Sequence, residues 1–303
     1  MTELANRLAD RIGQGLRGKQ EVIEFALITL FSGGHLLIED HPGVGKTLLA
    51  RSLARALDLP FQRIQCTADL LPADIVGAQV YHPRTGELTF RPGPVFTSVL
   101  LADELNRTPP RTQSALLECM EEGSVTVDRE THALPAPFFV IATQNPMTSA
   151  GTYPLPESQL DRFLLRVRLG YPDTENEIDV VAQEDGHRVV EELAAVATAE
   201  DVAAARRAVQ GVRCDRELTA FVVELAQRTR NTTDAVLGVS TRGAQALHRA
   251  CRARAWLHGR DFVVPDDVRA LLVPAWAHRI STVSGGDTEA LLHEVLAETP
   301  LPD

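Results

Sequence analysis

A glycine-rich turn at residues 40–47 carries the strongest chemical signal in the sequence. It follows an apolar run at 36–38 and ends in Lys46 and Thr47, where an amphipathic stretch begins. Such a turn at a helix start points backbone N–H groups at an anion, and the helix dipole favours negative charge there. The lysine can reach the β- and γ-phosphates of a nucleotide, and the threonine hydroxyl can ligate Mg²⁺. We therefore predict that the nucleotide is bound by Asp40, His41, Pro42, Gly43, Val44, Gly45, Lys46, Thr47 and Leu48.

One residue of this turn departs from the usual phosphate-binding pattern. The pattern GxxxxGK[ST] begins with glycine, whereas Asp40 stands at that place here. A carboxylate that faced the phosphates would repel them. We therefore expect the Asp40 side chain to point away from the ligand.

Two carboxylates follow an apolar run at 99–102. On its own, an acidic pair at the end of a strand is more often a solvated terminus. Downstream of a phosphate-binding turn, Asp103 can contribute to the Mg²⁺ site and Glu104 can orient and deprotonate an attacking water. Kinases, GTPases and transporters share the turn, but a glutamate beside the aspartate favours an ATPase that activates water.

Three further polar residues are candidates for catalysis. Asn145 follows the apolar run 138–142 and could hydrogen-bond the water, although Asn-Pro also starts turns. Arg162 precedes the last predicted strand, and Arg242 stands where a later helix begins. A guanidinium group can neutralise transition-state charge on the γ-phosphate. The alternatives are a surface ion pair for Arg162 and a solvated helix start for Arg242.

The elements that must position these residues alternate between strands and helices, which is typical of a parallel sheet covered by helices. The hydrophobic pattern changes after Pro172 and is helical from there to the end. Thr174 and Glu177 have the spacing of a capping box at the start of the first of these helices. We predict an α/β core at 1–172 and a helical domain at 173–303. The expected strands are 36–38, 61–65, 99–102, 138–143 and 163–167, and the clearest helices of the core are 46–57 and 111–122.

Two insertions interrupt the predicted core. Residues 81–90 and 123–134 each place a polar turn between short segments of high β-propensity. Both patterns predict β-hairpins, with ordinary surface loops as the alternative.

Composition limits the remaining possibilities. The 303 residues are 44% hydrophobic and 23% charged, which is typical of a soluble globular protein, and no apolar run approaches the ~20 residues of a membrane span. The amino terminus lacks the features of a secretion signal, so we expect a cytoplasmic protein without membrane insertion. The net charge of −11 does not favour nucleic-acid binding. Four dispersed cysteines and nine histidines show neither CxxC nor HExxH spacing, so we expect reduced thiols and no zinc.

The order of these motifs resembles one family, the MoxR-type AAA+ ATPases of the helix-2-insert, magnesium-chelatase-like clade. The resemblance covers essentially the whole chain. Its most specific segments are DELNR at 103–107, PPRTQSALLE at 109–118, ATQNP at 142–146 and YPLPESQLDRF at 153–163.

The resemblance implies a P-loop AAA+ fold: a three-layer αβα core with a parallel sheet, followed by a small all-α lid. It places Lys46 and Thr47 in Walker A, Asp103 and Glu104 in Walker B, and Asn145 at sensor 1. The segment that contains Gly18 and Gln20 would pack near adenine. By the same resemblance, Arg162 is the arginine finger that acts on a neighbouring subunit, and Arg242 is the sensor 2 arginine. The hairpins match the helix-2 and pre-sensor-1 inserts, which line the central face of a ring. Relatives often have Asp or Gly at position 40, and the role of Arg107 stays open.

The function implied is a Mg²⁺-dependent ATP hydrolase that forms a homo-oligomer, expected to be a hexameric ring. Members of this family resemble chaperones that remodel, assemble or activate partner proteins, often proteins with von Willebrand factor A domains. A nucleic-acid motor of the same clade is one alternative, but Arg129 and His132 in the second hairpin are offset by Asp128 and Glu130. A nucleotide-gated scaffold without hydrolysis is another, and the intact Asp103 and Glu104 argue against it.

Overall fold

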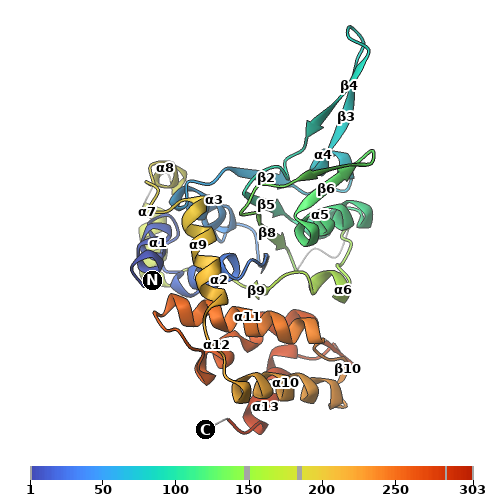
Figure 1. The fold of residues 1–303 in the computed structure, drawn as a ribbon. Coiled ribbons are helices and arrows are strands. Elements are labelled where there is room, and N and C mark those ends of the chain that lie inside the picture. The colour runs from blue at the N-terminus through green and yellow to red at the C-terminus, as the bar shows by residue number, and fades with distance from the viewer. Residues whose placement is uncertain (1, 147–150, 183–185, 284, 302–303) are drawn as a thin grey trace.

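A five-stranded parallel sheet forms the centre of the molecule (Figure 1). The computed structural model describes residues 2–146, 151–182, 186–283 and 285–301. All five predicted strands are present, and neighbouring strands run parallel. The predicted α/β fold is thereby confirmed. From one edge of the sheet to the other, the strands are β2 (Phe61–Gln65), β5 (Val99–Asp103), β8 (Phe139–Gln144), β1 (Leu36–Glu39) and β9 (Leu165–Val167).

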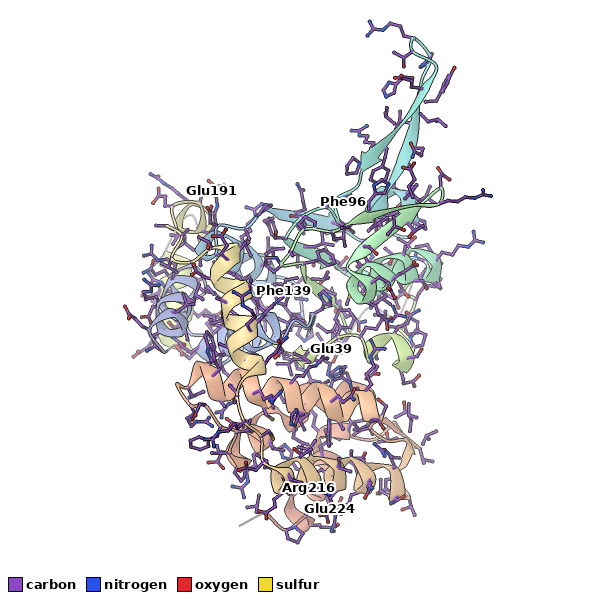
Figure 2. All side chains as sticks on the ribbon, in the orientation of Figure 1. Glu39, Phe96, Phe139, Glu191, Arg216 and Glu224 are labelled. Carbon is purple, nitrogen blue, oxygen red and sulfur yellow. The ribbon has the colours of Figure 1, made fainter. Side chains whose placement is uncertain are left out.

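Helices cover both faces of this sheet, because successive strand residues point to opposite faces. Leu36 and Ile38 join one apolar cluster and Leu37 joins the other. Phe139, labelled in Figure 2, is fully buried in the first cluster. That cluster includes residues of α1 (Thr2–Gly15), α2 (Gln20–Phe31) and α3 (Lys46–Ala56), and the second includes residues of α4 (Pro72–Val76) and α5 (Pro110–Glu122). The shorter elements η1 (Leu105–Arg107) and α6 (Glu157–Leu160) follow β5 and precede β9.

Both predicted hairpins are present. Strands β3 (Gly77–His82) and β4 (Glu87–Pro92) pair antiparallel and project away from the core, and β6 (Ser124–Val127) pairs with β7 (Glu130–Ala133) (Figure 1). The first hairpin begins earlier than the sequence pattern predicted. The rings of Phe90 on β4 and His132 on β7 stack with centroids 4.1 Å apart, so the two hairpins are in direct contact.

The second half of the chain is mostly helical, as predicted. Helix α7 begins at Thr174, but its first turn is capped by Asp173, whose carboxylate accepts the N–H of Asn176 at 2.9 Å. The predicted capping role of Thr174 is therefore wrong by one residue. A small antiparallel pair, β10 (Ala235–Leu237) and β11 (Ser281–Thr282), was not predicted. The helices are α7 (Thr174–Ala182), α8 (Gly186–Glu191), α9 (Ala199–Gln210), α10 (Arg216–Asn231), α11 (Thr241–Leu257), α12 (Pro265–Trp276), η2 (Ala277–Arg279) and α13 (Thr288–Glu298).

These later helices share their apolar core with the first half of the chain. Helix α8 packs on α1 and α3, α11 packs on α2, and α12 packs on β9. Accordingly, one continuous cluster includes residues from α2, α11 and α12. Among the described residues, no helix combines the length and the apolar character that crossing a bilayer would require.

A buried ion-pair network stabilises the helical domain. The carboxylate of Asp267 on α12 is inaccessible to solvent and accepts hydrogen bonds from Arg254 (2.7 Å), Arg260 (2.7 and 2.8 Å) and the Val264 N–H (2.9 Å). Burial alone raises the pKa of such a carboxyl group. These donors outweigh burial and lower the pKa of Asp267 below its usual value.

Candidate nucleotide-binding and catalytic site

A cleft of about 450 Å³ lies at the carboxyl ends of the central strands. Its volume is within the range of small-ligand sites, and its position is the usual one for ligands of open α/β sheets. The cleft combines most of the predicted phosphate-binding turn with both predicted carboxylates and Asn145. It is lined by Pro42, Gly43, Gly45, Lys46, Thr47, Leu48, Arg51, Arg63, Gln65, Asp103, Glu104 and Asn145.

The turn owes its shape to two glycines in the left-handed region. Gly43 has φ 88° and Gly45, the residue before α3, has φ 100°. A Cβ on Gly45 would also lie 2.9 Å from Cδ1 of Leu16, the residue that follows α1. The first N–H groups of a helix have no intrahelical acceptor, so those of α3 are available to an anion in the cleft.

Lys46 is a buried residue that lines this cleft, and its ammonium group donates to the backbone carbonyl of Asp40. Burial lowers the pKa of Lys46, and the negative charges of Asp40, Asp103 and Glu104 partly oppose that effect. The positive charge of Lys46 is therefore partly desolvated and lies near carboxylates. A phosphate group in the cleft could pair with it.

Asp40 does point away from the cleft, as expected. One carboxylate oxygen accepts the His41 N–H at 2.7 Å, and the other accepts the Gly170 N–H at 2.6 Å. The carboxylate thus ties the turn to the segment that follows β9. Neither Asp40, His41 nor the buried Val44 lines the cleft, so their effect on a ligand would be indirect.

Thr143 contacts both acidic residues at the end of β5, one through its carboxylate and one through its backbone. Its hydroxyl donates to Oδ1 of Asp103 at 2.7 Å and accepts the N–H of Glu104 at 2.8 Å. Glu104 has φ 58°, which is uncommon for a residue with a side chain. Sequence reasoning missed Thr143, although its place at the end of a strand two residues before Asn145 was a usable signal.

Three more side chains contact these carboxylates, and the sequence had singled out only Arg107, without a role. Arg63 on β2 pairs with Asp103 at 2.6 Å, and Arg107 pairs with Glu104 at 2.7 Å. The amide of Gln65, next but one to Arg63 on the same strand, lies 3.4 Å from the same Glu104 oxygen. The sequence offered one hint, since the predicted strand 61–65 has three polar residues, more than a strand buried on both faces would carry.

Asn145 follows β8 directly and lines the cleft, which agrees with its predicted place. Its backbone carbonyl accepts a hydrogen bond from the Asn106 amide at 3.4 Å. Strand β8 lies between β5 and β1, so the residue occupies the space between the two carboxylates and the phosphate-binding turn.

The segment predicted to lie near adenine is not among the residues that line the cleft. Gly18 has φ 68° and packs closely against Asn176: a Cβ on Gly18 would lie only 2.7 Å from Nδ2 of Asn176. Lys19 donates to the Tyr171 carbonyl at 2.6 Å. Gln20 lines a separate pocket with Gln14 and Arg17. The segment thus lies against residues 171–176, close to the point where Gly170 meets Asp40.

The two predicted arginines lie together, and neither lines the cleft. Arg162 contacts Glu121 at 2.9 Å, and Arg242 contacts the same carboxylate at 3.2 Å. Both arginines and Glu121 line a small cavity of about 150 Å³, which Arg249 lines as well. The structure therefore divides the predicted catalytic residues into two groups at different places on the subunit.

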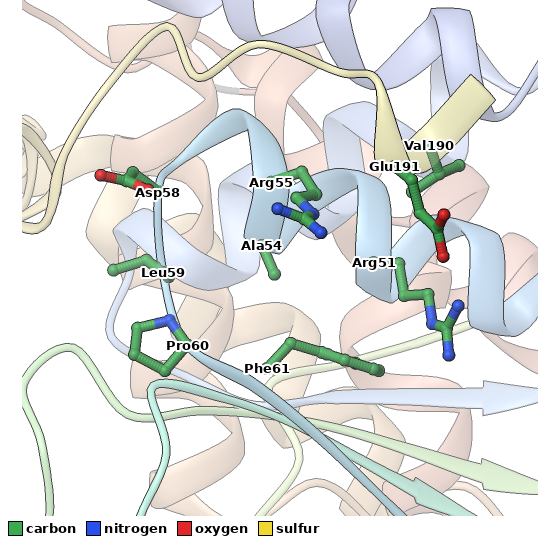
Figure 3. A pocket seen from close by; sticks show the side chains of 9 residues that line it. All are labelled: Arg51, Ala54, Arg55, Asp58, Leu59, Pro60, Phe61, Val190 and Glu191. Atoms are coloured by element: carbon green, nitrogen blue, oxygen red, sulfur yellow. The ribbon is translucent and has the colours of Figure 1, made fainter. Parts of the chain in front are cut away.

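A second pocket of similar size lies beside the cleft, on the outer side of α3 (Figure 3). Arg51 lines both, and its guanidinium group lies 5.8 Å from the centre of the Phe61 ring. Arg55, one helical turn later, lines only the outer pocket. None of the predicted site residues lines this pocket.

Comparison with known proteins assigns the family. Residues 35–165 match the profile of the "ATPase family associated with various cellular activities (AAA)", and residues 227–295 match that of the AAA lid domain. YeaC, an uncharacterised Bacillus subtilis protein, is 45% identical over 99% of this chain and 95% of its own length. Mycobacterium tuberculosis Chaperone MoxR1 is 34% identical over 94% of this chain and 79% of its own length.

A solved structure agrees with the sequence relatives. The crystal structure of a candidate ATPase from Cytophaga hutchinsonii superposes with a TM-score of 0.91 at 35% identity, covering 99% of this chain and 96% of that one. Protein MoxR of Methylorubrum extorquens is 32% identical over 92% of this chain and 88% of its own length. With a matching fold and relatives that span nearly the whole sequence, the chain belongs to the MoxR-type AAA+ ATPases.

Proposed function

We propose that this protein hydrolyses ATP with Mg²⁺ and works as a ring of identical subunits that remodels partner proteins. The observation that carries the proposal is the cleft in which the P-loop, Asp103, Glu104 and Asn145 converge. A binding protein without turnover would not need a glutamate beside the metal-site aspartate.

The side chains of the cleft suit a nucleotide and its metal. The left-handed turn at Gly43 and Gly45 leaves room for phosphates against the backbone, and Lys46 supplies a cation. The Thr47 hydroxyl and the Asp103 carboxylate are oxygen ligands of the kind that Mg²⁺ prefers. Bound Mg²⁺ would supply charge neutralisation at the β- and γ-phosphate oxygens.

The chain's own residues then act on the water. Glu104 accepts its proton, and the Asn145 side chain orients it toward the γ-phosphate. Thr143 holds the Glu104 backbone in place. One oxygen of the Glu104 carboxylate, Oε2, pairs with Arg107 at 2.7 Å, so the proposed proton transfer would use a carboxylate that Arg107 also holds.

Arg162 and Arg242 complete the site of the neighbouring subunit. Two facts support this part of the proposal: both side chains lie outside their own subunit's cleft, and Arg242 is half exposed. A trans-acting arginine contributes about 10³–10⁵ in rate in related hydrolases. Arg162→Ala and Lys46→Ala subunits should each be inactive alone but active when mixed. Mixed rings that form and stay inactive would refute catalysis across the interface.

The chaperone part of the proposal rests on the relatives. Chaperone MoxR1 shares 34% identity with this chain, and the β3–β4 hairpin offers an exposed surface with Tyr81 and Leu88. We expect a hexameric ring in the cytoplasm whose clients include proteins with von Willebrand factor A domains. Proteins that co-purify with the Glu104→Gln variant held in its ATP state should identify the client.

Phosphate release by the Glu104→Gln variant tests the catalytic assignment. Loss of a general base lowers the rate about 10²–10⁴-fold, whereas binding of ATP with Mg²⁺ should persist. The matched control is Glu122→Gln, an exposed glutamate at the end of α5. A Glu104→Gln variant that hydrolyses ATP as fast as the wild type would overturn the assignment.

A further inference from the structure

We infer that Glu121 is a positioning residue that holds Arg162 and Arg242 together, so that both reach the neighbouring subunit's nucleotide as one unit. The inference rests on the proposed function, because it assigns a role to a residue that supports the two trans-acting arginines. Glu121 touches neither the subunit's own cleft nor its P-loop.

The geometry is that of one carboxylate shared by two guanidinium groups. Glu121 stands one residue before the end of α5. Its Oε2 lies 2.9 Å from Nη1 of Arg162, and its Oε1 lies 3.2 Å from Nη2 of Arg242. Arg162 belongs to the core and Arg242 to the helical domain, so this carboxylate joins the two halves of the chain at the surface.

The shared carboxylate leaves donors free for a phosphate. A guanidinium group has five N–H donors in a planar fork. The recorded contacts of the Arg162 guanidinium, to Glu121 and to the Leu117 carbonyl, both use Nη1. Those of Arg242 use Nη2, toward Glu121, and Nε, 3.9 Å from Asp161. Within the described parts of the chain, Nη2 of Arg162 and Nη1 of Arg242 are therefore available, so Glu121 orients the arginines without saturating them.

A second, buried contact fixes the frame around this pair. Arg279 of η2 is 4% exposed, and its Nε donates to Oδ1 of Asp161 at 2.6 Å. The same guanidinium group also donates to the carbonyls of Asp161 at 3.1 Å and Phe163 at 2.6 Å. These are the residues on either side of Arg162. Arg279 thus anchors the loop that carries Arg162 to the helical domain.

Helix α11, which carries Arg242, packs closely against the Arg279 side chain. A Cβ on Gly243 would lie 3.0 Å from Cδ of Arg279, and the Gly243 carbonyl accepts the indole N–H of Trp276 at 2.9 Å. The backbones next to both arginines are therefore fixed. What remains to be set is the direction of two long side chains, and Glu121 is the acceptor that they share.

Charge explains why an acidic residue is needed here. Four guanidinium groups and two carboxylates line the cavity, so the arginines outnumber their partners. Burial lowers the pKa of Arg249, and the positive charge of Arg242 adds to that effect, so the guanidinium groups disfavour one another here. Without the charge of Glu121, Arg162 and Arg242 would separate.

Mixed rings test the inference. The reference mixture combines Lys46→Ala subunits, which donate intact arginines, with Arg162→Ala subunits, which bind nucleotide. Glu121→Gln is then placed on either subunit in turn. On the Lys46→Ala subunit we expect kcat to fall about tenfold to a hundredfold, which is the effect of misplacing a catalytic group by about 1 Å. On the Arg162→Ala subunit we expect no change. In both mixtures KM for ATP should stay within about twofold of the reference.

The outcomes separate the possible failures. Equal losses in the two mixtures, or no loss in either, overturn the inference while the proposed function stands. A reference mixture that assembles but shows no restored activity refutes trans catalysis, and the inference with it. Glu122→Gln in the same positions is the matched control and should change nothing. Gel filtration and thermal melting of each variant exclude a loss that comes from impaired folding or assembly, and a Glu121→Gln variant that cannot form rings also counts against a positioning role.

Discussion

Replacing Thr143 with valine should slow hydrolysis more than it destabilises the fold. The substitution keeps the side-chain shape but removes two hydrogen bonds, of 2.7 Å to Asp103 and 2.8 Å from the Glu104 N–H. A bond to a charged group contributes about 1.5–3 kcal/mol, and an unpaired buried N–H costs about 1–3 kcal/mol. Both partners are partly exposed, so the lower ends apply and we expect a loss of about 2–3 kcal/mol in the free energy of unfolding.

The effect on rate follows from the backbone of Glu104. Its left-handed conformation costs about 1–3 kcal/mol and persists because the surroundings fix it. Without the Thr143 hydroxyl, that segment relaxes and the Glu104 carboxylate shifts. A displacement of about 1 Å lowers a rate up to about 10²-fold, so kcat for phosphate release should fall about tenfold to a hundredfold.

Thr97→Val is the matched control for this experiment. Thr97 is equally buried, and its hydroxyl donates to the Pro60 carbonyl at 2.9 Å, away from the cleft. That carbonyl keeps a second donor, the Val99 N–H, so we expect a loss of about 1 kcal/mol in stability and an unchanged kcat. A Thr143→Val variant with the kcat of Thr97→Val would refute the role given to Thr143.

Two further substitutions test the fold and the P-loop. Asp267→Asn should lower the free energy of unfolding by about 3–5 kcal/mol, because it breaks a buried ion pair; chemical denaturation measures this. The pKa of Asp267 is lowered in the folded state, so below about pH 3.8 the unfolded chain takes up this proton first and the wild type loses stability, a loss that the variant should lack. Gly45→Ala should weaken binding of ATP with Mg²⁺ in a calorimetric titration, because φ is 100° there and the new methyl group would lie 2.9 Å from Leu16. Gly86→Ala, at a hairpin turn with open space around it, is its control and should bind ATP as the wild type does.

Local patterns were sufficient for the elements of the core. The strands could be predicted because each is a short apolar run next to a turn, and a sheet buried on both faces requires such runs. The hairpins could be predicted from their polar turns. The phosphate-binding turn and the carboxylates could be placed because the carboxyl ends of parallel strands meet at one edge.

The site residues that could not be predicted are brought together by packing between segments far apart in the sequence. Arg63, Gln65 and Thr143 enter the site only because β2, β5 and β8 are neighbours, and no local pattern states that order. The meeting of Arg162 and Arg242 at Glu121 likewise depends on how α11 packs on α2. The boundary at 172 stays a prediction, and α8, which lies beyond it, packs on the core.

The stack of Phe90 on His132 has a mechanical consequence for the projecting hairpins. The rings are 4.1 Å apart and 8° from parallel, and such a pair contributes about 0.5–1.5 kcal/mol, so a displacement of one hairpin would be passed in part to the other. Strand β7 is followed within a few residues by β8, which contains Thr143 and ends one residue before Asn145. The two hairpins are thus joined to each other by this stack, and one of them leads directly into the strand that carries Thr143, so a load on the hairpins would be passed toward the candidate site.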